Sequence, residues 1–331
     1  MFINLRNLLL VVAFAPLTVS AVSEEQFIRN VDVSAGAKLI VEVDFGAIDL
    51  ASGADGKVSV EAHRKIDFGD EAKEKEYLAN SPITLTQDGN VVTIRSRGKN
   101  AVHWESHHQH MEAKYTVRVP KKFEANLKTF GGSINARDMI GNLKANTSGG
   151  RMIFAHLEGE LDGQTSGGAI EVEDCNGPIA VEKSGGHVRV MQGRGSLNAE
   201  TSGGASEVRN FTGDTEVRTG GGGLVLEKVA GKLIGKTSGG GIKASIPRPV
   251  VGDVKLGTTA GSIDVAVPSE AELTIDAKTS VGQVMSTLPI QPAQTNRETL
   301  RGTLNGGGKS VHLETSAGNI TINPTGEVAA R

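Results

Sequence analysis

A four-residue signature, Thr-Ser-Gly-Gly, returns every 18 residues, and this spacing constrains the fold more than any other feature of the chain. Successive copies start at Thr129, Thr147, Thr165, Lys183, Thr201, Thr219 and Thr237. Looser copies start at Thr258, Thr279 and Thr315. Because a fixed short period means that one supersecondary unit is stacked on copies of itself, the repeat largely determines the fold.

Apolar residues lie two apart at two places in each unit. When positions are numbered from the threonine, positions 6 and 8 hold pairs such as Ile170 and Val172, and positions 15 and 17 hold pairs such as Ile179 and Val181. This alternation is typical of a strand with one buried face, so each unit predicts two short strands, near positions 5–9 and 14–18. Glycines at positions 3 and 4 mark one turn. Another glycine marks the second turn at position 13, as Gly141, Gly159, Gly177, Gly195, Gly213 and Gly231.

Equivalent strands in successive units should pair in parallel. The predicted fold is all-β: a flattened, parallel β-helix-like β-solenoid of 18–21-residue two-strand repeats, because the period lengthens to 21 after residue 240. The alternative is an antiparallel meander, which gives no reason to repeat the same corner every second turn. The repeated threonine should point inward, where its hydroxyl can bond corner backbone groups. The competing explanation is β-branched propensity alone.

The N-terminus reads as an export signal. Residues 1–21 contain Arg6, then an apolar run from Leu8, then small residues before Val22, as in a cleaved secretory leader. An uncleaved anchor is the alternative. No second apolar run follows, so we expect no transmembrane segment in the mature chain. We therefore expect an exported protein that is periplasmic, on the cell surface or secreted.

Three further regions follow the leader. Residues 22–128 lack the 18-residue rhythm and predict a β-rich N-terminal cap with one short helix, for which Asp70 is the expected N-cap. Residues 129–285 form the predicted solenoid. Residues 286–331 predict a loop, a hairpin joining 299–304 to 310–314, and a C-terminal lap of the same domain. The formal charge is −3 and no Lys/Arg-rich run occurs, which argues against a nucleic-acid partner.

A histidine cluster is the sharpest local signal. His103, His107, His108 and His110 lie within eight residues and could hold zinc or copper through imidazole nitrogens. The spacing matches no standard metal motif, however. The competing interpretation is a solvated loop or an edge strand.

Other reactive side chains fit the repeat better than an active site. Cys175 occupies position 11, where other units carry apolar residues, so we expect a buried thiol. Glu171, Glu173 and Asp174 could serve a polysaccharide-cleaving enzyme. However, Arg189 and Glu207 should continue a ladder of alternating charges from Glu171 on one outer face. The residues therefore predict no catalytic group and no cofactor.

Three segments carry a family resemblance: Ala35–Ile48, the Thr-Ser-Gly-Gly laps, and Leu304–Ile322 with its Gly-Gly-Gly and Thr-Ser-Ala-Gly-Asn-Ile sequences. With the leader, they resemble the bacterial putative-adhesin family, a β-strand-repeat domain of unknown function. The resemblance implies an exported β-solenoid linked to surface adhesion or envelope scaffolding, and the family offers no catalytic residues to carry over. Flat sheets rich in Ser, Thr, Asn and charge, with few aromatic residues, point to glycans or envelope polymers as weakly bound partners of a non-enzymatic adhesin or scaffold. The alternatives are a polysaccharide-acting enzyme on a β-helix scaffold and a metal-binding envelope protein. The oligomeric state stays open.

Overall fold

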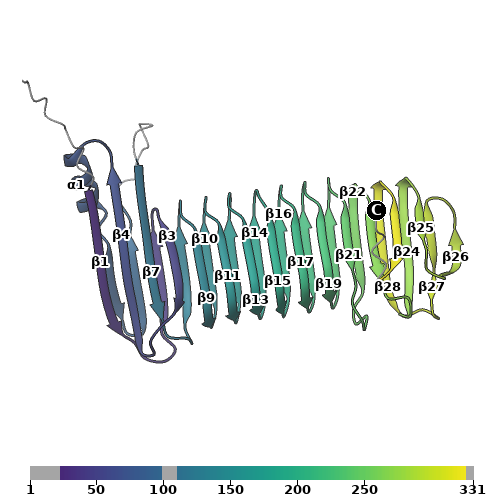
Figure 1. Ribbon diagram of the computed structural model, residues 1–331, viewed down its shortest axis with the longest axis horizontal. Helices are drawn as coiled ribbons and strands as arrows, with labels where there is room; N and C mark the ends of the chain where they lie inside the picture. Colours follow the sequence, from purple (N-terminus) through teal and green to yellow (C-terminus); the bar gives the residue numbers. More distant parts are fainter. Residues whose placement is uncertain (1–22, 99–109, 326–331) are drawn as a thin grey trace, which may run out of the picture.

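The computed structural model describes residues 23–98 and 110–325, and they form a long stack of two facing sheets (Figure 1). The predicted leader, residues 1–21, lies outside the described residues. The helix α1 (Glu71–Asn80) lies beside one end of the stack, and Asp70 caps it as predicted by accepting hydrogen bonds from the backbone of Ala72 and Lys73. Within the described ranges, no helix is long and apolar enough to cross a membrane.

The strands of the 14-stranded sheet follow one another in space as β1 (Ser23–Asp32), β4 (Lys57–Asp67), β7 (His110–Val119), β3 (Ala47–Ser52), β9 (Ile134–Ile140), β11 (Met152–Glu158), β13 (Ile170–Asn176), β15 (Val188–Arg194), β17 (Ser206–Thr212), β19 (Leu224–Ala230), β21 (Ile242–Ser245), β23 (Ile263–Val267), β29 (Ile320–Pro324) and β25 (Val284–Ser286). Those of the 15-stranded sheet are β26 (Gln291–Thr295), β27 (Thr299–Leu304), β24 (Leu273–Val281), β28 (Lys309–Ala317), β22 (Val254–Ala260), β20 (Leu233–Thr237), β18 (Thr215–Thr219), β16 (Leu197–Thr201), β14 (Ile179–Lys183), β12 (Leu161–Thr165), β10 (Leu143–Thr147), β8 (Glu124–Thr129), β2 (Lys38–Val43), β6 (Val91–Ser96) and β5 (Thr84–Asp88).

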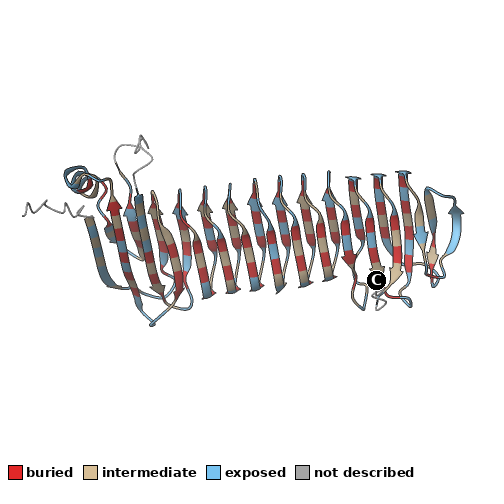
Figure 2. Ribbon diagram, turned by 45° about the horizontal axis from the view of Figure 1, so that its top comes forward, coloured by how far each residue is buried: buried red, intermediate tan, exposed pale blue. Residues whose placement is uncertain are grey.

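The laps pair in parallel and in register. In the 14-stranded sheet Ile170 of β13 lies opposite Val188 of β15, and in the other sheet Ile179 of β14 lies opposite Leu197 of β16. Each partner is 18 residues away, so side chains of one position form a column. The parallel β-solenoid is confirmed, and the antiparallel meander is wrong for these laps. Figure 2 shows that buried residues alternate with intermediate or exposed ones along the strands of these laps.

The threonine column points inward, as predicted. The Thr147 hydroxyl donates to the carbonyl oxygen of Gly132 at 2.8 Å, and Thr237 does the same to Gly222 at 2.7 Å. Both threonines are buried. Each hydroxyl therefore ties its lap to a corner carbonyl of the preceding lap, a group that the strand ladders leave free.

The first strand of each lap is longer than predicted and contains a left-handed residue. Position 10 has a φ of 47 to 60° in six successive laps, and β13 continues past it to Asn176. This turn of the backbone shifts the alternation, so positions 6, 8 and 11 all face inward. The six residues are Asp138, His156, Asp174, Gln192, Asn210 and Lys228.

The C-terminal end corrects the predicted hairpin. β27 does not pair with β28; it pairs antiparallel with β24 on one side and with β26 on the other. β28 lies on the opposite side of β24 and pairs in parallel with both β24 and β22. The turn that connects β27 to β28 crosses the start of β24. There the Asn305 side chain donates to the carbonyl oxygens of Ser269 and Ala271. The last lap in sequence is thus inserted between two earlier laps.

Candidate functional site

The outer face of the 14-stranded sheet is crossed by ion pairs that join neighbouring laps. Arg189 Nε lies 3.0 Å from a carboxylate oxygen of Glu207, which confirms that part of the predicted ladder. Glu171 instead contacts Arg151 and, at 3.5 Å, His187. The charges on this face are largely satisfied by the protein itself.

These pairings act against acid catalysis. Partial burial raises the pKa of Glu171, but hydrogen bonds from Arg151 and His187 outweigh it and hold that pKa below the usual range. A hydrogen bond from Arg209 lowers the pKa of Glu207. A glycoside-cleaving acid needs a raised pKa and a second carboxylate at a fixed distance. The lowered pKa values of Glu171 and Glu207 are the opposite of what such an acid requires.

The predicted metal ligands fall mostly outside the described residues. His103, His107 and His108 lie in the segment 99–109, which the structure does not describe. His110 is exposed at the start of β7, with its Nε2 3.1 Å from a carboxylate oxygen of Glu112. Within residues 23–98 and 110–325, no group of three or more His, Cys, Asp or Glu side chains could hold a metal ion.

Cys175 lies in the core, as its column predicts. It is 1% exposed, and its Sγ lies 3.4 Å from the carbonyl oxygen of Glu173. Burial raises the pKa of this thiol to about 11. A nucleophilic cysteine needs the opposite shift and access to solvent.

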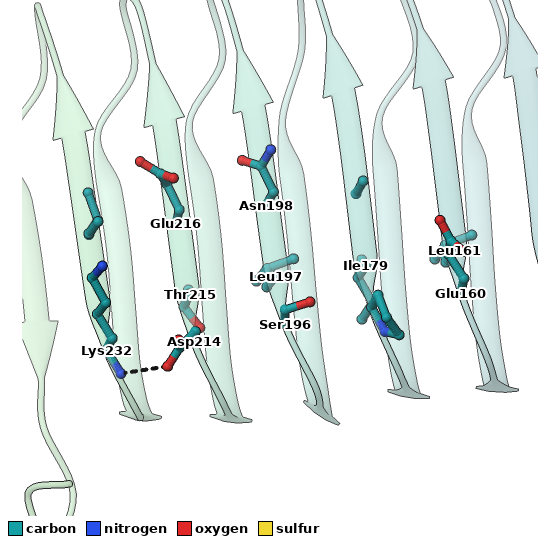
Figure 3. A pocket seen from close by; sticks show the side chains of 13 residues that line it. Glu160, Leu161, Ile179, Ser196, Leu197, Asn198, Asp214, Thr215, Glu216 and Lys232 are labelled. Atoms are coloured by element: carbon teal, nitrogen blue, oxygen red, sulfur yellow. Dashed lines mark hydrogen bonds between the residues drawn. The ribbon is translucent and has the colours of Figure 1, made fainter. Parts of the chain in front are cut away.

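The outer face of the 15-stranded sheet carries a shallow groove of about 340 Å³ (Figure 3). Its floor consists of small side chains that two successive laps place at positions 14 and 16, on and just before β14 and β16: Pro178, Ala180, Ser196 and Asn198. Glu160 borders one side, and Glu216 and Lys232 border the other. Glu160, Glu216 and Lys232 are longer than the floor side chains and stand along its borders.

Polar groups continue from this groove toward the Thr-Ser-Gly-Gly corner. Glu182 and Glu200 occupy adjacent laps at position 18, and neither has an ion-pair partner among the residues that the structure places. A second hollow further along the same face is lined by Arg218, Lys236 and Lys255. Exposed corner hydroxyls line that hollow as well: Ser202, Ser238, Thr259 and Ser316. The sequence carries no reactive motif on this face, and its only signal there is the run of small side chains at positions 14 and 16 in two successive laps.

Lys183 is the one residue other than threonine at the first position of the first seven corners. It replaces the inward threonine, is 3% exposed, and its Nζ donates to the carbonyl oxygens of Gly168 and His187. Burial lowers its pKa. A buried ammonium group therefore donates the hydrogen bond to the corner carbonyl that a threonine hydroxyl donates in the other laps.

Lys183→Thr is expected to stabilise the protein by about 1 kcal/mol, because a neutral donor replaces a buried charge. The pH dependence should also change. The folded-state pKa of Lys183 is lowered, so the unfolded chain binds more protons between that pKa and about 10.5, and stability rises with pH in this window. Urea unfolding at several alkaline pH values should show a smaller rise for Lys183→Thr than for wild type.

Lys183→Met separates the loss of the buried charge from the gain of a neutral donor, because it removes the charge without restoring a hydroxyl. It should also lose the alkaline rise. Since Tyr115 and Cys175 titrate in all variants, only the difference from wild type reports on Lys183. If the difference in unfolding free energy between each variant and wild type stayed constant across this pH range, the lowered pKa of Lys183 would be contradicted.

The chain is similar to one protein family and to several solved structures. The sequence profile described as Toastrack DUF4097 matches residues 39–323. No curated protein matches the sequence. A solved "putative adhesin" from Parabacteroides merdae has 10% identity and a TM-score of 0.40, covering 91% of this chain and 96% of that one. A "putative lipid binding protein" from Parabacteroides distasonis has 10% identity and a TM-score of 0.32, covering 89% and 96%.

Proposed function

This chain belongs to the Toastrack DUF4097 family, and we propose that it is an exported, non-enzymatic β-solenoid whose 15-stranded sheet binds glycans or other cell-envelope polymers, as an adhesin or a scaffold. The groove over β14 and β16 is the observation that carries this proposal. Its floor of Pro178, Ala180, Ser196 and Asn198 lets an extended chain approach the sheet.

Regular spacing supports a polymer rather than a small ligand. Paired strands lie about 4.8 Å apart, so polar groups of one column recur at that interval along the face. The groove is open and shallow, and each contact within it would be weak. A polymer that engages several laps at once gains affinity through effective concentration, without any single tight contact.

Binding without turnover fits the side chains that line the groove. Glu160 and Glu216 lie on opposite sides of it, and Asp214 accepts a hydrogen bond from the backbone of Lys232 at 3.3 Å (Figure 3). The Glu216 carboxylate is also paired with the guanidinium of Arg218 in its own strand. The polysaccharide-acting enzyme is therefore the second candidate only, and it becomes an outcome of the test.

The test uses purified protein against a glycan array and insoluble envelope fractions, with products assayed in parallel. Ala180→Arg fills the groove from an outward strand position and should lower binding at least tenfold. Ala266→Arg makes the same change on an outward position of the other sheet and should bind like wild type. Equal binding by both variants, or no binding by wild type, would overturn the proposal. Turnover that survives extensive purification would favour the enzyme instead.

A further inference from the structure

The two ends of the stack protect their strand edges differently. At the C-terminal end, β25 has three residues, and β26 is exposed throughout, contains Pro292 and breaks register there. Such devices prevent edge pairing. At the N-terminal end, β1 pairs with β4 along ten residues in unbroken register, and no other described strand pairs with it (Figure 1).

The backbone groups on the open edge of β1 can be identified. Just past the strand, the amide of Val33 donates to Gly56 of the neighbouring chain segment at 2.9 Å. Because bonding direction alternates along an antiparallel ladder, the odd-numbered residues bond toward β4. The amides and carbonyls of Gln26, Ile28 and Asn30 therefore point to the open side.

We propose that β1 pairs with β1 of a second copy, antiparallel, about a two-fold axis at Phe27. This register sets Phe27 against Phe27 and Gln26 against Ile28, and it sets Glu25 of each copy against Arg29 of the other. An aromatic pair and two opposite-charge pairs then form on one face. The interface is self-complementary and closes as a dimer rather than growing into a fibre.

Neighbouring registers are worse. Only registers that place even residues opposite even residues satisfy the open backbone groups. Moving the axis to Ile28 sets Glu24 against Asp32, and moving it to Arg29 sets two guanidinium groups together. Like charges that face each other across strands destabilise the pair. Moving the axis to Gln26 sets Glu25 against Phe27 and forms neither the aromatic pair nor the opposite-charge pairs. The sequence of β1 therefore favours the axis at Phe27.

The side chains along this edge have surface left to bury. Ile28 is 52% exposed, and Phe27 and Val31 are only partly buried at the end of the core. The guanidinium of Arg29 lies 5.0 Å from the Phe27 ring and has no carboxylate partner among the residues placed in the structure. Its Nη1 donates to the Ile28 carbonyl of the same chain at 2.8 Å, a contact that pairing with a second strand would replace. A second copy would cover the apolar groups and bring the carboxylate of its Glu25. The Oε2 atom of that carboxylate bonds the buried Arg64 of its own chain, so Oε1 is the atom that would face Arg29.

Light scattering across concentration tests the proposal, and wild type should have the mass of a dimer. Ile28→Pro removes an amide that faces the open side, so the β1–β4 ladder stays intact while the dimer is lost. Arg29→Glu should weaken the dimer at least tenfold by facing Glu25. Ala293→Pro on β26 is the matched control and should leave the mass unchanged. Circular dichroism checks that each variant is folded.

Cross-linking tests the register. The Cα atoms of a non-hydrogen-bonded pair are about 4.5 Å apart, within disulfide range, so Phe27→Cys should give a covalent dimer on oxidation. Asn30→Cys would lie about 20 Å from its copy and should not. The single native cysteine is buried and gives no background. A monomer at all concentrations, or a dimer that persists in folded Ile28→Pro, would overturn the proposal, whatever the outcome for polymer binding.

Discussion

Gly150→Ala is expected to destabilise the protein by about 3 kcal/mol or more, whereas Gly149→Ala should change stability by less than about 1 kcal/mol. A β-carbon on Gly150 would lie 1.9 Å from the carbonyl oxygen of Gly132 in the preceding lap. That carbonyl also accepts the hydroxyl of Thr147, so it cannot move aside without breaking the corner bond. The clash is with backbone, and a change of rotamer does not relieve it.

The adjacent glycine provides the matched control. A β-carbon on Gly149 meets nothing within 4 Å, and Gly149 is not in the left-handed region of φ. Urea unfolding of both variants, followed by circular dichroism, measures the difference. Similar losses for the two variants would mean that backbone flexibility rather than lap-to-lap contact explains the paired glycines.

The repeat made most of the architecture predictable. A constant 18-residue spacing leaves parallel pairing in register as the arrangement that stacks every column on itself, as Ile170 and Val188 show. The same logic placed Thr147 inward and Cys175 in the core. These predictions succeeded because each depends on a column repeated over several laps rather than on one residue.

Two features could not be predicted, because no residue type repeats at the positions that produce them: the left-handed residue in each lap and the strand order at the C-terminal end. Position 10 adopts a left-handed φ in six laps, yet the residues there range from Asp138 to Lys228 and none is glycine. The turn around Asn305 favoured a hairpin on local grounds. Instead, β28 places Thr315 between Thr258 of β22 and Thr279 of β24. Pairing in register with these two strands decides the position of β28, not the preference of the turn for a hairpin. Such long-range insertion leaves no mark in the sequence near the turn.

Phe154→Ala is expected to cost about 3–5 kcal/mol, as is usual when a buried phenylalanine is truncated. Phe154 is completely buried, and its ring fills a space opened by a glycine on the facing sheet. A β-carbon on Gly163 would lie 3.1 Å from Cε2 of that ring. Since the cavity is enclosed by neighbouring laps that are fixed in register, it should collapse little. Urea or thermal unfolding measures the loss.

The next lap shows how the same space can be filled differently. Val172 and Val181 occupy the columns of Phe154 and Gly163 there. Phe154→Val should therefore leave a cavity, and Gly163→Val should clash with the ring, but the double variant should copy the neighbouring lap. We expect the double variant to be more stable than the sum of the single losses by at least about 1 kcal/mol. Additive losses would mean that the ring and the glycine do not share this space, and the large-to-small pairing across the sheets would then not explain the core.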